Sequence, residues 1–538
     1  MITRGHRSLA GVLLWGAVVL AAVLLRLDLA RGQSLWADEL FSLAMATGHS
    51  LEHPAREADA SRGDYVESPR AEPPAHYARY LRHDDPPAGP ARVVRAVFIS
   101  DTSPPLYYLL LSLWTRVLGT SDPALRIFSI GASLSCLPFL IGAARRTGGP
   151  RAALPAVVLF AVSPVCVYYS SEGRMYALLW LWTSCWLWLS LKLRREPRPA
   201  TYAAWVSAAA AGLLTHYFFA PLLGAGIGWL LMRPGRASRR ALGVSTAAVA
   251  LLVLPWYAWV PASLAQWRVT AGWLHVHPGA NMRVAALLLP WSSVWLRPWP
   301  GLQNTIDWVN LALFSLVFAL AARRLGWRLL TGSRPLLWLC FVVALLTPLV
   351  LDLVGGTYMV AVIRYSLAAL PAFCLLGGMA FGALQPLLRT LLVSLFVLLA
   401  LYGHRERRFT RHGEPIDALG RLLVTETRAS DVVVVHSIPS GVCGVARAMI
   451  RAGSGPGVSM ASWVGRLRAG WDLRELQGLA RGRRRITLVK VHTVGEPAPQ
   501  EGWLRENARL VFERRVQNAE VLVFEPSAGE TFFPEVDD

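Results

Sequence analysis

The sequence predicts a polytopic α-helical membrane protein that carries a small α/β domain at its C-terminal end. Three observations lead to this fold class. Apolar runs of nearly membrane-spanning length recur as far as about residue 401, and 54% of the 538 residues are hydrophobic while only 16% are charged. The mean hydropathy is +0.39. After His404 the long apolar runs stop, and short strand-like segments alternate with helical patterns.

The first apolar run, residues 9 to 25, follows a short basic end and is long enough to span a bilayer once Arg26 snorkels to the interface. No small-residue cleavage site follows it, so we interpret it as a retained membrane helix and not as a signal peptide. Ten further runs bring the expected number of crossings to about eleven. The runs centre near residues 17, 135, 160, 184, 208, 225, 250, 314, 344, 374 and 395.

Four basic clusters separate consecutive apolar runs and fall on the same side as the N-terminus, which is therefore predicted to be cytoplasmic. They are Arg145/Arg146/Arg151, Lys192/Arg194/Arg195/Arg198, Arg233/Arg236/Arg239/Arg240 and Arg323/Arg324/Arg328/Arg334. Membrane orientation explains the net charge of +20 better than a nucleic-acid partner does. The expected location is the bacterial cytoplasmic (inner) membrane, crossed several times, with the opposite loops and the tail outside.

The predicted domains are a transmembrane domain, residues 1 to 403, and an extracytoplasmic α/β domain, residues 404 to 538. The first outer loop, residues 31 to 123, is expected to hold interfacial helices near its two ends. Between them, residues 50 to 92 lack periodicity and are predicted to be irregular. A second outer loop, residues 261 to 303, is rich in Trp, which favours an aromatic belt over a sugar-stacking platform. The tail shows no Gly-rich phosphate loop or acid/base constellation, so we expect it to cover the membrane site or to bind a partner.

Polar side chains recur at the outer ends of the apolar runs. The tetrapeptide Trp36-Ala37-Asp38-Glu39 places two adjacent carboxylates just outside the first run. The other members are Asp101, Glu172, Arg174, Tyr176, His216, Arg364 and Tyr365. Because ionisable groups are costly at membrane depth, their recurrence on one side predicts a shared polar cavity open to the outer leaflet. Taken singly, each has a structural explanation, such as snorkelling of the arginines or a hydrogen bond between helices.

These residues belong to an ordered series of short motifs. In chain order the series is Trp36-Ala37-Asp38-Glu39-Leu40, Asp101-Thr-Ser-Pro-Pro-Leu-Tyr-Tyr108 followed by Leu125-Arg126, Ser163-Pro164 with Tyr169-Ser-Ser-Glu-Gly-Arg-Met-Tyr176, Thr215-His216-Tyr217, and Arg364-Tyr365 with Leu370-Pro371. It resembles the motif series of GT-C glycosyltransferases, the polyprenyl-phosphate-sugar-dependent membrane enzymes related to protein O-mannosyltransferases and the lipid A aminoarabinose transferase. The likeness extends over residues 8 to 400. Ser103 stands where many relatives have His, and the insertion at residues 50 to 92 is unusually long.

The resemblance implies a GT-C-like helical membrane fold, a lipid-linked sugar donor, and an acidic residue of the first outer loop acting near the acceptor. That acid maps onto Asp38, with Glu39 beside it. A polyprenyl phosphate departs without protonation, so one carboxylate base on the acceptor hydroxyl can suffice, and Asp38 is the expected base. Arginine binds phosphate oxygens bidentately and keeps its charge when partly desolvated, so Arg174 and Arg364 are expected to clamp the donor phosphate.

The remaining residues are expected to bind substrate. Glu172 would orient Arg174 or contact sugar hydroxyls, and Tyr176, His216 and Tyr365 are further candidates for binding substrate. Glu39 and Asp101 could shape the acceptor side or hold a divalent cation, Mg or Mn, through their carboxylates. No other cofactor is expected.

The leading function is transfer of one sugar from polyprenyl phosphate to a protein, lipid or glycan acceptor at the outer face of the membrane. A transporter or flippase of a lipid-linked saccharide is the first alternative, but it should show internally repeated halves, and no repeat is visible. A non-catalytic envelope assembly protein is the second, and it would tolerate loss of Asp38.

Overall fold

The computed structural model describes residues 9–31, 34–53, 58–101, 103–262, 305–407, 414–455, 457–467, 473–527 and 531–533. By their internal contacts the residues form two compact units, one of Met1–Gly32 with Arg126–Phe409 and one of Gln33–Leu125 with Thr410–Asp538. We call them the helical unit and the mixed unit. The first outer loop thus groups with the tail, whereas the predicted boundary at residue 403 had joined it to the transmembrane helices. Nearly all of the predicted Trp-rich loop, residues 263 to 303, lies outside the described residues.

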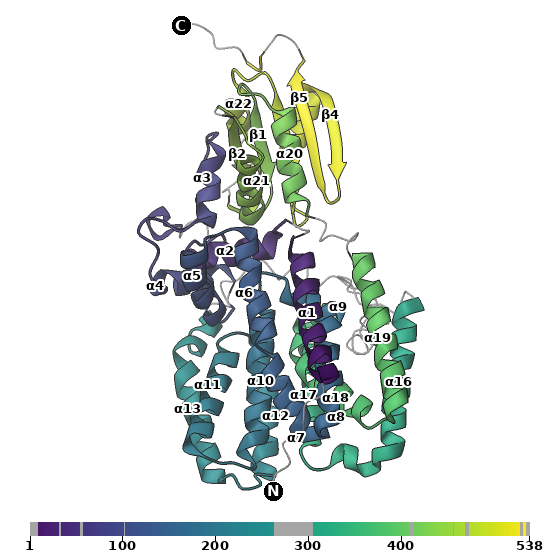
Figure 1. Cartoon of the computed structure of the whole chain (residues 1–538). Coiled ribbons are helices and arrows are strands. Elements are labelled where there is room, and N and C mark those ends of the chain that lie inside the picture. Colours follow the sequence, from purple (N-terminus) through teal and green to yellow (C-terminus); the bar gives the residue numbers. More distant parts are fainter. Residues whose placement is uncertain are drawn as a thin grey trace. The chain divides into compact units, whose positions relative to one another are not determined.

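The helical unit is a bundle of apolar helices, in which α10, α11 and α13 lie side by side (Figure 1). The helices are α1 (Leu9–Arg31), α6 (Asp122–Leu134), α7 (Leu137–Gly148), α8 (Pro150–Val162), α9 (Pro164–Ser170), α10 (Tyr176–Leu193), α11 (Pro199–Leu213), α12 (Phe219–Met232), α13 (Arg239–Tyr257), α16 (Thr305–Leu325), α17 (Arg334–Gly355), α18 (Leu370–Gly382) and α19 (Pro386–Arg407). Helix α6 begins in the mixed unit.

Six helical segments among the described residues are long and apolar enough to cross a membrane, and the bent pair α8–α9 would be a seventh. The expected number of about eleven counted every apolar run as one crossing. The runs centred near residues 208 and 225 instead form α11 and α12, which have 15 and 14 residues and are shorter than a simple span. The helical membrane fold is confirmed, with fewer full-length spans than predicted.

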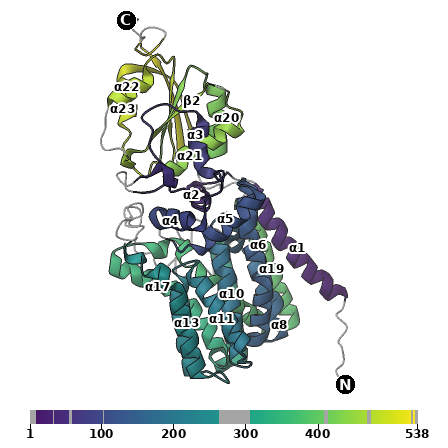
Figure 2. The ribbon, with the colours of Figure 1, turned by 90° about the vertical axis from the view of Figure 1, so that its left-hand side faces the viewer.

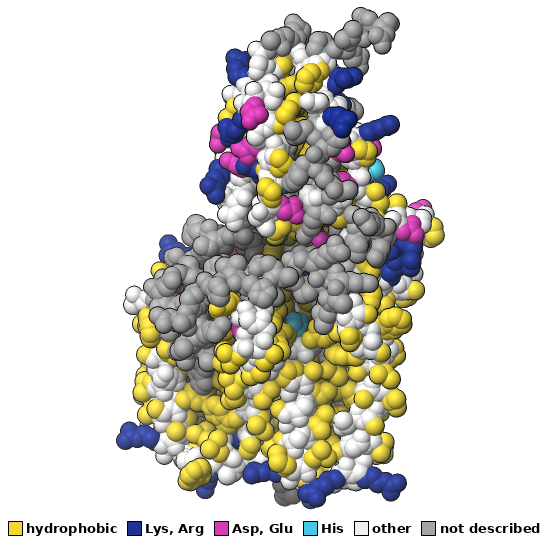
Figure 3. Space-filling view, turned by 180° about the vertical axis from the view of Figure 1, so that it is seen from behind, with side chains coloured by type: hydrophobic (Ala, Val, Ile, Leu, Met, Phe, Trp, Pro, Cys, Tyr) yellow, Lys and Arg dark blue, Asp and Glu magenta, His cyan; other side chains and the backbone are white. Residues whose placement is uncertain are grey.

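The surface of the helical unit is largely hydrophobic, and Lys and Arg side chains gather at one end of its helices (Figure 3). Arg26 does not follow the predicted snorkelling. It is fully buried, and its guanidinium donates to the carbonyl oxygens of Ala161 at 2.9 Å and Phe160 at 3.1 Å and to the Ser133 hydroxyl at 3.2 Å. These acceptors lie in other helices, which is why the charge can stay inside the bundle.

The mixed unit contains a five-stranded sheet in the order β2-β1-β3-β5-β4. Strand β1 (Val432–His436) is parallel to β2 (Ser459–Trp463) and β3 (Ile486–Lys490), whereas β5 (Ala519–Pro526) is antiparallel to β3 and to β4 (Ala508–Val516). Helices α20 (Ile416–Glu426) and α21 (Pro439–Arg451) lie on one side of the sheet, and α22 (Leu473–Ala480) and α23 (Pro499–Asn507) lie on the other (Figure 2). The predicted small C-terminal α/β domain is confirmed.

The first outer loop contributes α2 (Ala37–Ala46), α3 (Pro74–Ala78), α4 (Pro90–Ser100) and α5 (Leu106–Leu118). The two helices expected near its ends are present as α2 and α5. Most residues of α2 are buried, and Leu40 packs against Gly444 of α21, so α2 is an interior helix of the mixed unit and not the predicted interfacial one.

The described part of residues 50 to 92 that precedes α4 has little regular structure, only η2 (Ala60–Arg62), α3 and η3 (Arg79–Leu81), as predicted, but it is packed. Tyr65 and Tyr77 are fully buried. Glu67 accepts hydrogen bonds from the Ser462 hydroxyl and, at 2.9 Å, from the Val464 amide, and Glu72 forms an antiparallel bridge with Met460. These partners come from the tail, and local periodicity cannot reveal them.

The first outer loop also holds buried ionisable groups, among them Asp64 and His49. The fully buried Asp64 carboxylate makes two bonds to the Arg95 guanidinium, at 2.6 and 2.7 Å. Burial alone would raise the pKa of Asp64, but the bonds to Arg95 outweigh it and lower that pKa. Burial lowers the pKa of His49 to about 4 in spite of the nearby Asp84 carboxylate, 3.3 Å from its ring. His49 is therefore neutral at pH 7.

Candidate functional site

The predicted site residues fall into two groups, one in each unit. Asp38 and Glu39 occupy the first turn of α2, where a helix N-terminus stabilises negative charge. Glu39 is 1% exposed, and its carboxylate accepts from the Trp36 amide at 3.4 Å in a capping box. Asp38 is only half-buried. Of the two adjacent carboxylates, Glu39 thus caps the helix, and Asp38 is the more accessible.

Glu414, which the sequence gave no reason to single out, holds the same helix end. Its carboxylate accepts from the Ala37 amide at 2.8 Å and lies 2.6 Å from Nδ1 of His492. The Ser34 hydroxyl bonds to the Glu414 carbonyl at 3.2 Å. The start of the tail therefore fixes the first turn of α2, on which Asp38 lies.

Asp101 follows the end of α4 and accepts two hydrogen bonds from its own motif. The Tyr108 hydroxyl donates at 2.7 Å and the Ser103 hydroxyl at 3.1 Å. Ser103 thus serves as a hydrogen-bond donor at the position where many relatives have His. Asp101 remains half-buried at the beginning of the segment that leads to α5.

In the helical unit, Glu172 and Arg174 lie in the short turn between α9 and α10, and Tyr176 begins α10. All three are buried. The turn is tight because the Arg174 amide donates to the Glu172 carbonyl at 2.8 Å, and the Ser129 hydroxyl donates to the Arg174 carbonyl at 3.4 Å. This backbone geometry sets where the Arg174 guanidinium can reach.

His216 is the centre of the second group. It follows α11, and its ring lies 6.1 Å from that of Tyr176. Both Arg174 and Arg364 are close enough to act electrostatically on it. Since Nδ1 of His216 accepts from the Phe218 amide at 3.1 Å, the neutral ring carries its proton on Nε2.

Tyr365 joins this group through the Phe218 ring, whose centroid is 5.5 Å away, and the Arg364 guanidinium lies over the Tyr365 ring at 5.7 Å. Arg174, Tyr176, His216, Arg364 and Tyr365 therefore come together from three segments separated by long stretches of sequence.

The segment that carries Arg364 is organised by Asp352, a second residue that sequence reasoning missed. Its buried carboxylate accepts from the Thr357 hydroxyl at 2.6 Å and from the amides of Met359 at 2.7 Å and Val360 at 2.8 Å. Trp180 of α10 donates to the Leu367 carbonyl at 2.8 Å on the other side of Arg364. An apolar helix ending in Asp before Gly-Gly was the available sequence signal.

The described part of the chain contains no cluster of side chains that could hold a metal ion. Among these residues, no three His, Cys, Asp or Glu side chains lie close enough together to hold an ion. Glu39 and Asp101, which could have shared a cation, instead accept hydrogen bonds from their own segments.

Residues 102–259 match the sequence model of the dolichyl-phosphate-mannose-protein mannosyltransferase family. No curated protein matches the chain significantly. Among solved structures, ArnT from Cupriavidus metallidurans bound to undecaprenyl phosphate has a TM-score of 0.55 and 13% identity, covering 95% of this chain and 98% of ArnT. Apo ArnT has a TM-score of 0.54 and 12% identity, covering 89% and 95%. AglB from Archaeoglobus fulgidus, in complex with an inhibitory peptide and a dolichol-phosphate, has a TM-score of 0.48 and 11% identity, covering 88% and 69%.

The expected resemblance to GT-C polyprenyl-phosphate-sugar-dependent membrane glycosyltransferases is thus confirmed by a sequence match and by a shared fold. The shared fold combines apolar helices with a small sheet domain at the C-terminal end. At 12 to 13% identity, the likeness to ArnT is one of fold.

Proposed function

We propose that this protein transfers one sugar from a polyprenyl-phosphate donor to an acceptor at the outer face of the bacterial cytoplasmic membrane. The observation that carries the proposal is the group of Arg174, His216 and Arg364 in the helical unit; Arg174 and His216 lie within residues 102–259, which match the dolichyl-phosphate-mannose-protein mannosyltransferase family. Two arginines around a neutral imidazole suit a lipid-linked phosphate, because they supply fixed cationic and hydrogen-bond donors beside apolar helices.

In the proposed reaction, Arg174 and Arg364 hold the donor phosphate, and Nε2–H of His216 donates to a phosphate or sugar oxygen. The acceptor oxygen attacks the anomeric carbon while its proton passes to the Asp38 carboxylate. The bond from the anomeric carbon to the phosphate oxygen breaks, and its electron pair remains on polyprenyl phosphate. The arginines stabilise the charge that develops there.

The other residues act by position. Glu172 shares the tight turn with Arg174 and is buried beside it, which suits a role in orienting the guanidinium. Tyr176 and Tyr365 flank His216 and Phe218 and present ring faces and hydroxyls to the sugar. Asp101 and Glu39 shape the acceptor side through the segments they cap. The acceptor can be a protein, a lipid or a glycan hydroxyl.

The base assignment is tested with Asp38→Asn. This variant keeps the size of the side chain and should leave folding and membrane insertion unchanged, while transfer falls by about a hundredfold or more. Glu39→Gln is the matched comparison, because its amide oxygen can still accept from the Trp36 amide and cap α2 while Asp38 is kept, so transfer should fall much less. Undiminished transfer by Asp38→Asn would reject Asp38 as the base.

The phosphate clamp is tested by binding, which needs no acceptor. Arg364→Ala should weaken binding of undecaprenyl phosphate by about tenfold or more, the loss of one charge-assisted contact. Arg240→Ala removes an exposed arginine from the first turn of α13 and should leave the affinity unchanged. Equal affinities of the two variants would remove Arg364 from the donor site.

A further inference from the structure

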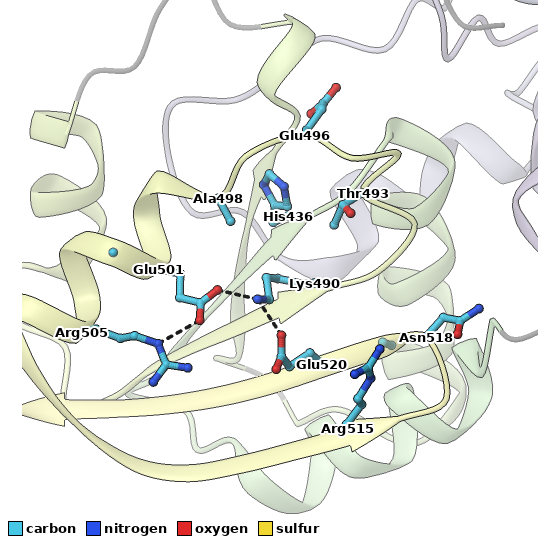
Figure 4. Close-up of a pocket in the computed structure, with 12 residues that line it drawn as sticks. His436, Lys490, Thr493, Glu496, Ala498, Glu501, Arg505, Arg515, Asn518 and Glu520 are labelled. Carbon is cyan, nitrogen blue, oxygen red and sulfur yellow. Dashed lines mark hydrogen bonds and ion pairs between the residues drawn. The ribbon is translucent and has the colours of Figure 1, made fainter. Parts of the chain in front are cut away.

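The carboxyl ends of the parallel strands in the mixed unit border a cavity of about 610 Å³ (Figure 4). In the order β2-β1-β3, the chain passes from β1 to β2 on one side and then from β2 to β3 on the other side of β1. Open α/β sheets bind ligands at such a switch point, outside the carboxyl ends of the strands. The cavity lies there, since His436 ends β1 and Lys490 ends β3. Nothing in the proposed transfer reaction uses this cavity.

Four cavity residues form one row across the sheet. His436 pairs in register with Lys490, Lys490 with Glu520, and Glu520 with Arg515, so the row crosses β1, β3, β5 and β4. Register partners project to the same face of a sheet. Strand spacing of about 4.8 Å makes the row about 14 Å long.

The row continues the face that packs against α22 and α23. Along β1, Val432 and Val434 belong to the apolar core on this face, together with Trp503 and Leu504 of α23. Two residues after Val434 the same face presents His436. The face therefore changes from a hydrophobic core to a polar wall at the end of the sheet where β1 and β3 finish.

His436 is the residue that indicates a ligand. Its side chain is 0% exposed, and neither ring nitrogen makes a hydrogen bond of ordinary geometry to the described residues. Burial lowers its pKa, although the backbone of Glu496 partly opposes this effect, so the ring is neutral at pH 7. A neutral imidazole has one donor and one acceptor nitrogen. Leaving both unsatisfied in the interior is costly for stability.

The charged groups of the cavity balance one another. Lys490 bonds to Glu501 and, at 2.6 Å, to Glu520, and Arg505 bonds to Glu501 at 2.9 Å (Figure 4). Arg515 and Glu496 add one charge of each sign. A strongly charged ligand would meet a like charge beside every opposite one. A ligand whose groups both donate and accept would find partners along the whole row.

We propose that this cavity binds a saccharide, because sugar hydroxyls donate to carboxylates and accept from cations and amides at the same time. Asn518 and Thr493 complete the polar wall with groups of the same dual character. His436 would supply a donor and an acceptor at the buried end of the row. The length of the row suits more than one sugar ring.

The test uses the full chain in nanodiscs, with chitotriose, mannotriose, cellotriose and maltotriose as probes and inorganic phosphate as a charged comparison. Saturation-transfer NMR and thermal unfolding report binding. We expect at least one trisaccharide to bind at millimolar concentration and phosphate not to compete with it. His436→Leu and Glu520→Gln should weaken that binding by about tenfold or more.

Two comparisons separate a binding role from a structural one. Glu525→Gln removes a carboxylate from the same strand, where it bonds to Arg485 and Arg509 away from the cavity, and it should bind the trisaccharide as the wild type does. Ligand-free His436→Leu should unfold at the same or a higher temperature, because it replaces a buried unsatisfied ring. The proposal is overturned if no trisaccharide binds, if phosphate displaces the sugar, or if His436→Leu unfolds at a lower temperature and still binds it.

Discussion

Removing the Glu414 carboxylate should loosen the helix end that carries Asp38. The carboxylate accepts from the first amide of α2, at Ala37, and also contacts His492. Both partners lie in the mixed unit, so the effect should stay within that unit. Glu414→Ala deletes these contacts without filling the space, and Glu414→Gln keeps an acceptor but removes the charge.

The size of the effect follows from two terms. A hydrogen bond to a charged group contributes about 1.5–3 kcal/mol, and a negative charge at a helix N-terminus about 0.3–1 kcal/mol. Local opening of α2 should therefore become easier by about 2 kcal/mol or more in Glu414→Ala, which corresponds to about thirtyfold faster amide exchange. Glu414→Gln should give about half of this change in free energy, because a neutral acceptor bonds roughly half as strongly.

Hydrogen exchange read by mass spectrometry on the peptide of residues 34 to 46 measures this directly. Glu506→Ala, which removes an exposed glutamate from the end of α23, is the control and should leave that peptide unchanged. Transfer activity should fall with Glu414→Ala while binding of undecaprenyl phosphate is kept. Unchanged exchange of residues 34 to 46 would refute the reasoning, whatever happens to activity.

Three further predictions follow from buried polar groups. Burial lowers the pKa of His49 in the folded protein to about 4, so the unfolded chain takes up the proton first as the pH falls. The stability present above pH 6.5 is therefore lost as the pH falls toward 4, by about 2 kcal/mol between pH 7 and pH 5. Urea unfolding of His49→Gln should show a correspondingly flatter pH dependence of stability. Asp64→Asn leaves Arg95 without its carboxylate and should cost about 3 kcal/mol, read as a lower unfolding temperature of the mixed unit, which an unchanged transition would contradict. Asp352→Asn puts an amide donor against a backbone N–H and should lower stability by about 1–3 kcal/mol. It should also weaken binding of undecaprenyl phosphate, because it displaces Arg364. Unaltered affinity would show that the segment keeps its shape without the carboxylate.

The parts of the fold that could be predicted from the sequence are those that depend on local patterns of residue type. Apolar length marked the helices, and the β-branched runs at residues 432 to 435 and 486 to 489 marked β1 and β3. Strand β2, Ser459–Trp463, was missed because it contains no β-branched residue and is a strand only through its pairing with β1.

Contacts between distant segments set the limit of prediction. The outer loop was expected to be irregular because it lacks periodicity, but its packing could not be predicted, since the partners of Glu67 lie 395 and 397 residues further along the chain. Arg26 was expected to reach the membrane surface, since its acceptors on other helices are invisible in a hydropathy profile. Whether a polar side chain is buried depends on its contacts with segments that are distant in the sequence, and local patterns do not reveal those contacts.

The candidate site divides along the same line. Motif order identified Arg174, His216 and Arg364, and the structure gathers them in the helical unit. It could not identify Glu414 or Asp352, because neither belongs to a motif and each acts only by fixing the backbone beside a motif residue. The residues proposed to touch substrate stand in sequence motifs, whereas the residues that hold them in position are recognised only in the fold.

The proposed base and the proposed phosphate clamp belong to different units, and this makes the two halves of the reaction separable by experiment. Asp38 depends on the mixed unit through Glu414, and Arg364 depends on the helical unit through Asp352. A change at Glu414 should therefore lower transfer and spare donor binding, while a change at Asp352 should weaken donor binding directly. If both changes weakened donor binding to the same extent, proton removal and phosphate binding would not be assigned to separate units, and the roles given to Asp38 and Arg364 would have to be redrawn.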